Sequence, residues 1–221
     1  MELNENWIVF EEESIEQQKL KNFKNDCRSL TEDIVVQKYL IDGASYFFQF
    51  HLDETQEFQF KKSIAESLSV HIREVAIVGS GKLGFSVKPD RSNPGFYPFK
   101  VFDQDYVSDS TKKKSDLDVA IVSGKLFDEQ LVSLYDHTDS YMDTVFSGSA
   151  KNQFAKYVLK GWIRPDKLPD NYIISPSIGN VQSELSAKYS REVNIGIYKS
   201  WYYFERYHRA NIHTLSLNLI A

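Results

Sequence analysis

Two stretches of the sequence decide the fold: VAIVGS at residues 75–80 and SDLDVAIV at residues 115–122. Each contains a short apolar run rich in β-branched residues, which favours a buried strand. Side chains two residues apart on a strand point to the same face of the sheet. We therefore expect Asp116 and Asp118 to point the same way, and Leu117 to point into the core.

The paired carboxylates predict a site for a divalent metal. Two carboxylates side by side on a rigid strand repel each other unless a cation lies between them. Hard oxygen ligands of this kind suit Mg²⁺ or Mn²⁺. The Gly79-Ser80 turn offers backbone N–H groups and a hydroxyl, which can hold the phosphates that such metals bridge. Asp116 and Asp118 are therefore the candidate metal ligands.

A Gly-Ser turn at the end of one strand, followed by Asp-x-Asp on a later strand, resembles the polymerase-β-like nucleotidyltransferase superfamily. The resemblance covers about residues 73–123. It implies a small mixed sheet flanked by helices, Mg²⁺ or Mn²⁺ on two catalytic carboxylates, and template-independent transfer of a nucleotidyl group with loss of pyrophosphate. The matching residues are Gly79, Ser80, Asp116 and Asp118, with Ser115 in front of the first aspartate.

The resemblance also implies roles for the turn and a class of substrate. Ser80 and the backbone near Gly79 and Gly81 would hold the β- and γ-phosphates of a nucleoside triphosphate, Lys82 would neutralise the leaving pyrophosphate, and Ser115 would complete the nucleotide-binding set. The acceptor would be a hydroxyl on a nucleotide, an oligonucleotide or a protein. Chain length and the GKLGFS turn resemble the anti-phage (antiviral defence) members, which implies an operon-encoded protein partner.

Two departures from the family pattern leave a second function open. A long segment separates Ser80 from Asp116, and residues 88–114 are expected to project beside the site as a loop. The later strand that would supply a third carboxylate carries Asn194 at the matching position, with Glu192 as the nearest acid on that face. The alternative is therefore a catalytically degenerate binding or antitoxin-like module.

The glycine-rich turn also fits two other phosphate-binding motifs. Gly79, Gly81 and Gly84 match the G-x-G-x-x-G dinucleotide fingerprint, with Asp103 about 20 residues further on. That fingerprint needs a crossover helix, for which the proline-rich residues 88–98 leave too little room. A Walker A loop fits worse, because it requires Ser or Thr where this chain has leucine after Gly-Lys.

Other conspicuous residues are interpreted as structural. Asp103 and Asp105 lie in a turn-rich segment and are expected on a surface loop, and Lys112-Lys113-Lys114 is expected to be solvated. The aromatic residues within 201–207 are expected to pack a helix on the sheet rather than to stack a nucleobase. Cys27 is expected to lie exposed on a helix without a partner.

Composition limits the classes of protein further. The 221 residues are 42% hydrophobic and 26% charged, which is enough to bury a core. The formal net charge of −5 argues against tight non-specific binding to nucleic acid over the whole surface. A single cysteine excludes an internal disulfide and favours a cytoplasmic location. We expect no signal peptide and no membrane insertion, since no apolar run approaches about 20 residues.

The order of expected elements indicates a mixed α/β (α+β) fold: a helical segment at residues 1–70 packed on a nucleotidyltransferase-like core at residues 71–221. The expected helices lie within 14–70, at 126–135, within 141–159 and at 201–212, the strands at 73–78, 117–123 and 192–198, and the loops at 88–114 and 164–180.

Overall fold

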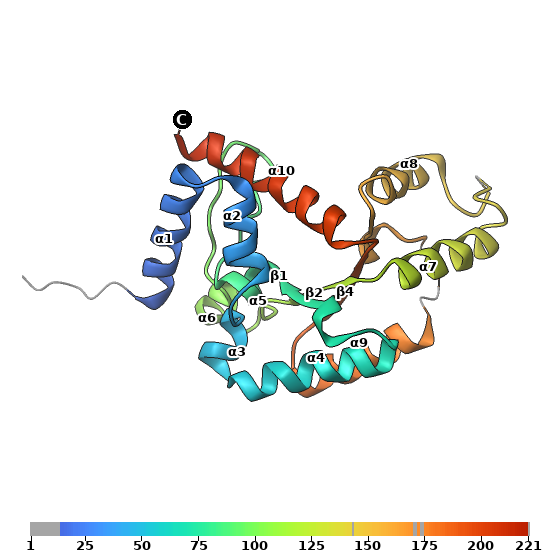
Figure 1. The fold of residues 1–221 in the computed structure, drawn as a ribbon, viewed down its shortest axis with the longest axis horizontal. Coiled ribbons are helices and arrows are strands. Elements are labelled where there is room, and N and C mark those ends of the chain that lie inside the picture. Colours follow the sequence, from blue (N-terminus) through green and yellow to red (C-terminus); the bar gives the residue numbers. More distant parts are fainter. Residues whose placement is uncertain (1–13, 143, 170–171, 173–174, 221) are drawn as a thin grey trace, which may run out of the picture.

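The computed structural model describes residues 14–142, 144–169, 172 and 175–220. Within these residues the chain forms a mixed α+β fold, in which a four-stranded sheet lies between two groups of helices (Figure 1). In chain order the elements are α1 (Ile15–Ser29), α2 (Glu32–Val36), the π-helix η1 (Gln37–Ile41), α3 (Tyr46–His51), α4 (Glu54–Leu68), the 3₁₀ turn η2 (Ile72–Glu74), β1 (Val75–Val78), α5 (Gly79–Leu83), α6 (Gln104–Ser108), β2 (Leu117–Val122), α7 (Gly124–His137), α8 (Gly148–Val158), β3 (Trp162–Ile163), the 3₁₀ turn η3 (Pro165–Lys167), α9 (Pro176–Tyr189), β4 (Val193–Tyr198) and α10 (Trp201–Ile220).

The sheet has the strand order β1-β2-β4-β3. β1 is antiparallel to β2, β2 is parallel to β4, and β3 is antiparallel to β4. In this register Asp118 on β2 lies opposite Val78, the last residue of β1, and opposite Asn194 on β4. The three expected strands are therefore confirmed. β3 was not expected, because two residues are too few to show an alternating pattern.

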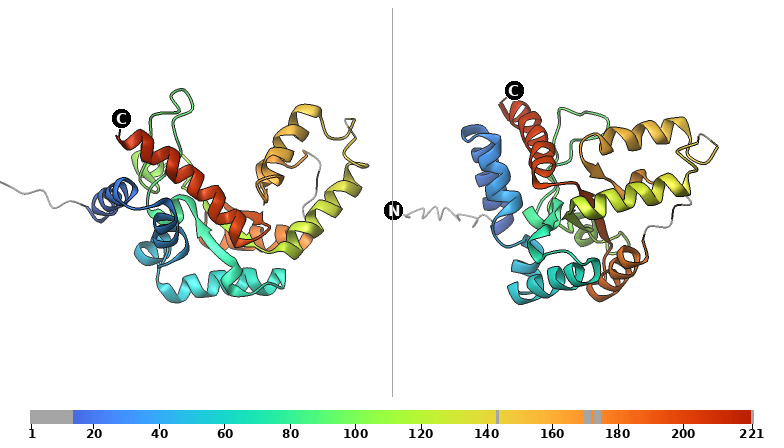
Figure 2. Two further views of the ribbon diagram at one scale, coloured as in Figure 1. Left: turned by 45° about the horizontal axis from the view of Figure 1, so that its top comes forward. Right: turned by 45° about the vertical axis from the view of Figure 1, so that its right-hand side comes forward.

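Helices cover both faces of the sheet. α4 and α9 pack on the face where Leu117, Val119 and Ile195 are buried. η1 and α10 contact the other face, with α2 packed against α10, and there Ala120 is buried. Because side chains alternate along a strand, Asp118 lies on the same face as Ala120, towards α10. Figure 2 shows α7 and α8 at the end of the molecule opposite α1.

Helix α1 begins at a capping box formed by Ser14 and Gln17 and packs onto α2 and α10. Its buried side chains include Phe23 and Cys27, so the expectation of an exposed cysteine was wrong. The spacing of four residues puts both on one face, which is turned to the core. Burial raises the pKa of the Cys27 thiol to about 12, which leaves it unreactive near neutral pH.

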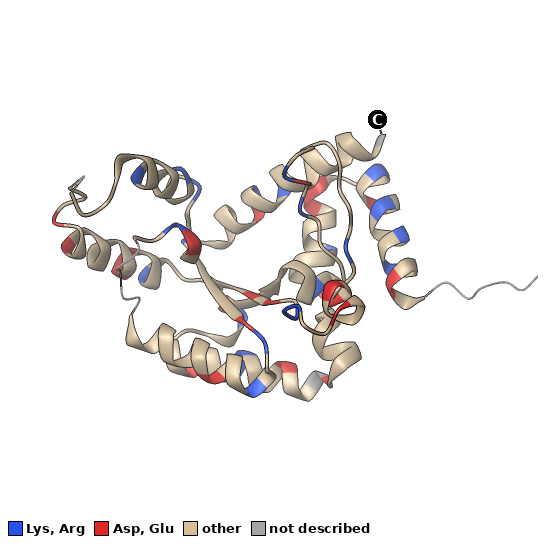
Figure 3. Ribbon diagram, turned by 180° about the vertical axis from the view of Figure 1, so that it is seen from behind, with Lys and Arg blue, Asp and Glu red and all other residues tan. Residues whose placement is uncertain are grey.

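Basic residues are frequent along α1 (Figure 3). Lys24 lies over the ring of Phe99 at 4.2 Å, and the guanidinium of Arg28 donates to the carbonyl oxygen of Leu219 on α10. These contacts fasten the N-terminal helix to the rest of the chain through residues far apart in sequence.

The C-terminal half differs from expectation in its helix boundaries. α9 begins at Pro176, inside the segment 164–180 that was expected to be mainly loop, because proline is well suited to the first turn of a helix. Residues 170–171 and 173–174 of that segment lie outside the described residues. α10 continues well past residue 212. The expected aromatic packing is confirmed for Phe204, whose ring centroid lies 5.1 Å from that of Tyr198 on β4, but not for Tyr202, which is 64% exposed. No described helix has both the length and the apolar character needed to cross a bilayer.

The insertion at residues 88–114 is attached to the core rather than projecting freely. A bridge joins Phe85 to Val101, and the side chains of Phe99 and Phe102 are buried. The tip of the loop near Gly95 lies beside Asn218 of α10. Figure 2 shows this loop, in green, beside the red α10. Only the exposed part, which includes Lys112 and Lys113, matches the expectation of a solvated loop.

Candidate active site

The structure brings the two predicted carboxylates together at the start of β2. Asp116 immediately precedes this strand and Asp118 lies on it. The side-chain amide of Asn194 on β4 donates to Asp116 Oδ2 at 3.1 Å and to Asp118 Oδ1 at 3.4 Å. All three side chains are partly buried. One nitrogen within hydrogen-bond distance of both carboxylates shows that the two acids face a common point.

Gly79, the first residue of α5, lies against the Asp118 carboxylate. Gly79 has a φ of +67°, in the left-handed region that glycine adopts without strain. A methyl group at this position would stand only 2.9 Å from Asp118 Oδ2. Glycine is therefore required here both by its backbone conformation and by the close approach of the acid.

Replacing Gly79 with alanine is expected to weaken divalent-metal binding about 10-fold, because the added methyl group must displace the Asp118 carboxylate. The left-handed backbone adds a destabilisation of about 1 kcal/mol. Mn²⁺ titration and thermal denaturation measure the two effects separately. Gly43→Ala is the matched control, since Gly43 has a φ of +72° and no atom within 4 Å of an added methyl group. Equal Mn²⁺ affinity in both variants would contradict the assignment.

The other two glycines of the turn serve close packing. A methyl group at Gly81 would stand 2.9 Å from a methyl carbon of Leu117, and one at Gly84 would stand 2.7 Å from the ring of Tyr46. Close packing against Leu117 and Tyr46 therefore explains why residues 81 and 84 are glycines. The dinucleotide alternative also requires a crossover to a parallel strand, whereas β1 and β2 are antiparallel. This topology rules out the dinucleotide fingerprint.

Lys82 is not directed towards the carboxylates. Its side chain is buried, and its Nζ donates to the carbonyl oxygens of Asp42 at 2.8 Å and Gly43 at 2.6 Å, just after η1. Burial lowers the pKa of Lys82 to about 8, although the two carbonyl dipoles favour the charged form. This position does not support the predicted contact with pyrophosphate, so Lys82 is left out of the site.

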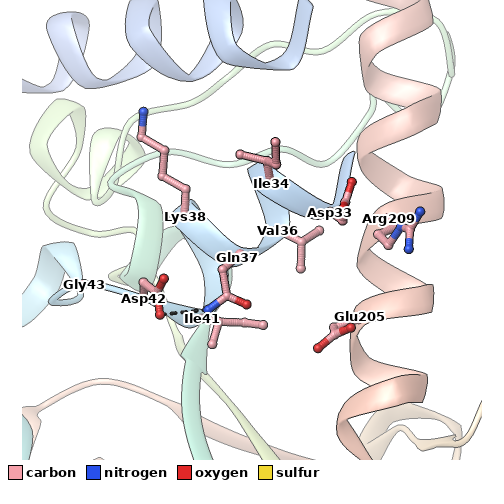
Figure 4. Close-up of a pocket in the computed structure, with 10 residues that line it drawn as sticks. All are labelled: Asp33, Ile34, Val36, Gln37, Lys38, Ile41, Asp42, Gly43, Glu205 and Arg209. Carbon is pink, nitrogen blue, oxygen red and sulfur yellow. Dashed lines mark hydrogen bonds between the residues drawn. The ribbon is translucent and has the colours of Figure 1, made fainter. Parts of the chain in front are cut away.

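A pocket of about 620 Å³ is lined in part by Asp42 and Gly43, whose carbonyl oxygens accept from Lys82 (Figure 4). It lies between α2 and η1 on one side and α10 on the other. Acidic and basic side chains both line it, and neither Asp116 nor Asp118 is among them. The lining residues are Asp33, Ile34, Val36, Gln37, Lys38, Ile41, Asp42, Gly43, Glu205 and Arg209. We therefore do not assign a nucleotide to this pocket.

Electrostatics at the site follow from burial and from the close pair of acids. Burial raises the pKa of Asp118, and the negative charge of Asp116 raises it further. Lys88, the Asn194 amide and Arg164 act in the opposite direction. A divalent cation between the carboxylates would remove the repulsion, and two carboxylates with an amide oxygen are the donors that Mg²⁺ and Mn²⁺ accept.

Arg164 is a functional candidate that the sequence did not reveal. It follows β3, and its guanidinium forks onto Asp166 at 2.8 and 2.9 Å. The same group donates to the hydroxyl of Tyr157 and lies 5.0 Å from the ring of Trp162. Its charge acts on Asp118 from the β3 side of the sheet. The short strand before it has no periodicity that would have indicated this placement.

Ser115 is held by the insertion. Its Oγ accepts from the backbone N–H of Asp103, and its own N–H donates to the Asp103 carboxylate at 2.7 Å. Asp103 is buried and pairs with Arg191, so the expectation that it lies on a surface loop was wrong. Asp105 does lie on the surface, where it pairs with Lys100.

Asn194, not Glu192, lies beside the two acids. The Glu192 side chain is 60% exposed and stands 3.8 Å from Lys113, whereas the register puts Asn194 directly opposite Asp118. Within the described residues, no group of three or more His, Cys, Asp or Glu side chains is arranged to hold a metal ion. The candidate metal ligands are therefore the two carboxylates, with the Asn194 amide donating to both.

Comparisons of the chain with protein-family models, with curated proteins and with solved structures found no match.

Proposed function

We propose that the protein is a metal-dependent nucleotidyltransferase, which moves a nucleoside monophosphate from a triphosphate to a hydroxyl acceptor. The observation that carries the proposal is the convergence of Asp116 and Asp118 on one amide nitrogen of Asn194, with Asp118 directly against Gly79. Paired acids beside a tight turn form an arrangement suited to a metal-bound triphosphate.

The proposed reaction is an in-line displacement at the α-phosphorus. The acceptor oxygen forms a bond to phosphorus, the bond to the β-phosphate oxygen breaks, pyrophosphate leaves, and the hydroxyl proton passes to water. Mg²⁺ or Mn²⁺ on Asp116 and Asp118 would lower the pKa of the acceptor hydroxyl and offset the charge of the phosphates. Asn194 and the backbone bonds around Asp116 hold the two carboxylates in place for this purpose.

The remaining residues of the site supply contacts to the phosphates. Ser80, the residue after Gly79, would supply its hydroxyl and backbone N–H to the phosphates, and Gly79 lets the backbone approach Asp118 closely. Lys88 and Arg164 are the cations whose charges act on Asp118, so they replace Lys82 as the candidates for neutralising the leaving pyrophosphate. The acceptor is a nucleotide, an oligonucleotide or a protein, and a role in anti-phage defence with an operon-encoded partner belongs to the same proposal.

One observation favours a second function, that of a degenerate binding module. The Asn194 amide donates to both carboxylates, and this neutral donor occupies the position of a third acid. Because the amide already donates hydrogen bonds to both carboxylates, a cation between them is less necessary. In that case the protein would bind a nucleotide or a partner without turnover.

The two functions are separated by incubating the protein with each labelled nucleoside triphosphate or deoxynucleoside triphosphate. Mg²⁺, Mn²⁺ or a chelator is added, and an oligonucleotide or a mixture of proteins is supplied as acceptor. Metal-dependent incorporation of label with release of pyrophosphate supports the enzyme. Nucleotide binding without release of pyrophosphate supports the binding module. The absence of both nucleotide binding and incorporation would refute the enzyme and the nucleotide-binding form of the module.

A further inference from the structure

A buried ion pair lies next to the candidate site and joins the insertion to β4. Asp103 binds both terminal nitrogens of Arg191, at 3.3 Å for Oδ1 to Nη1 and at 3.1 Å for Oδ2 to Nη2. Their side chains are only 11% and 5% exposed. The guanidinium lies 4.4 Å from the ring of Phe47 and 4.8 Å from the ring of Phe102. Pairing, ring contacts and burial restrict this arginine to one position.

The Asp103–Arg191 pair is hydrogen-bonded to Ser115, the residue immediately before Asp116. Ser115 N–H donates to Asp103 Oδ1, Asp103 N–H donates to Ser115 Oγ, and Arg191 Nη1 donates to the Ser115 carbonyl oxygen at 2.8 Å. The N–H and C=O of Ser115 are thus both bonded to one ion pair. Asp103 adopts a φ of +59°, a strained conformation for a residue other than glycine, and these bonds hold it there.

On the other side of Asp116, the N–H of Leu117 donates to the carbonyl oxygen of Glu192 at 2.8 Å. The backbone on both sides of Asp116 is therefore hydrogen-bonded: Ser115 to the side chain of Arg191, and Leu117 to the carbonyl oxygen of Glu192. Asp118 is fixed by the regular ladder of β2, whereas Asp116 precedes that ladder and depends on these bonds.

We propose that Asp103 and Arg191 are positioning residues for the Asp116 carboxylate, so that the insertion forms part of the active site. This inference rests on the proposed function, because it concerns the geometry of the same metal site. The positioning acts through the backbone of Ser115, and neither member of the pair touches metal or substrate. A simple anchor for the insertion would stabilise the fold without determining metal affinity.

The test uses the full chain with Asp103→Asn and Arg191→Lys. The first variant removes the negative charge, and the second keeps the positive charge but loses the forked contact. Asp105→Asn is the matched control, because Asp105 lies in the same insertion and forms an exposed pair with Lys100. Mn²⁺ binding is measured by electron paramagnetic resonance, and hydrogen exchange is measured for peptides covering residues 115–118 and, for comparison, α4.

We expect both variants to bind Mn²⁺ about 10-fold more weakly or worse, the range for lost outer-shell partners of a metal ligand. Exchange should become faster at residues 115–118 while α4 keeps its protection, and the Asp105 control should match the unaltered protein. Unchanged affinity, or exchange that rises equally in α4, would overturn the inference. If the unaltered protein binds no Mn²⁺ at this site, the proposed function fails, and the positioning of Asp116 for a metal fails with it. If the two variants incorporate less label but bind Mn²⁺ as tightly as the unaltered protein, only the inference fails.

Discussion

Replacing Asp118 with alanine is expected to abolish nucleotidyl transfer, lowering the rate at least about 10³-fold, the scale for removing a charged group that acts on the reacting atoms. The same change removes one of two mutually repelling acids. The free energy of unfolding without metal should therefore stay within about 1 kcal/mol of the original or rise. Label incorporation, Mn²⁺ binding and chemical denaturation measure the three effects.

The pH dependence of this variant follows from the raised pKa of Asp118. In the folded protein this carboxyl holds its proton to a higher pH than in the unfolded chain, so its contribution to stability is lost as pH rises through the folded pKa. The alanine variant lacks that loss. Its stability relative to the original should grow as pH rises above 3.8, the ordinary value, and then level off. Asp128→Ala, which removes an exposed acid paired with Lys199, is the control and should show full activity.

Replacing Asn194 with aspartate is expected to have opposite effects with and without metal. Without metal, a third carboxylate would stand beside Asp116 and Asp118, and the amide that donates to both would be lost. The free energy of unfolding should therefore fall by about 2 kcal/mol at neutral pH. With Mn²⁺, the added charge should tighten binding at least about 10-fold, since metal affinity rises with the number of charged ligands. A 10-fold gain adds about 1.4 kcal/mol of stabilisation at saturating metal.

Thermal denaturation over a range of Mn²⁺ concentrations measures both parts of this prediction. Asn194→Ala is the control, because it removes the amide without adding a charge. Identical Mn²⁺ dependence in the two variants would mean that Asn194 does not adjoin the metal site. If the natural protein is a binding module without turnover, the aspartate variant should also gain metal-dependent incorporation that the original lacks.

The sheet and the paired acids were predictable because their determinants are local. Alternation in residues 117–122 assigns Asp118 to one face and Val119 to the core, and the same alternation in residues 193–198 identifies Asn194 as the partner position. No tertiary information is needed for such an assignment. The antiparallel pairing of β1 with β2 was not predictable in this way, yet it rules out the dinucleotide fingerprint.

The misread residues depend on contacts between distant parts of the chain. Asp103 lies in a segment without apolar periodicity, and its burial results from an arginine 88 residues away. Lys82 follows a glycine-rich turn, where a phosphate contact is the natural interpretation, yet its acceptors belong to a π-helix end about 40 residues earlier. A single sequence carries no local signal for either pairing.

The attachment of Lys82 to the end of η1 has a consequence for how the protein can be dissected. A truncation starting at residue 71 would take away both carbonyl acceptors of this buried ammonium group, together with the α4 side chains that share a buried core with β1. Residue 70 therefore marks a change of secondary structure inside cores that both sides share. We expect the helical half and the half that carries the sheet to fold only when they are expressed as one polypeptide.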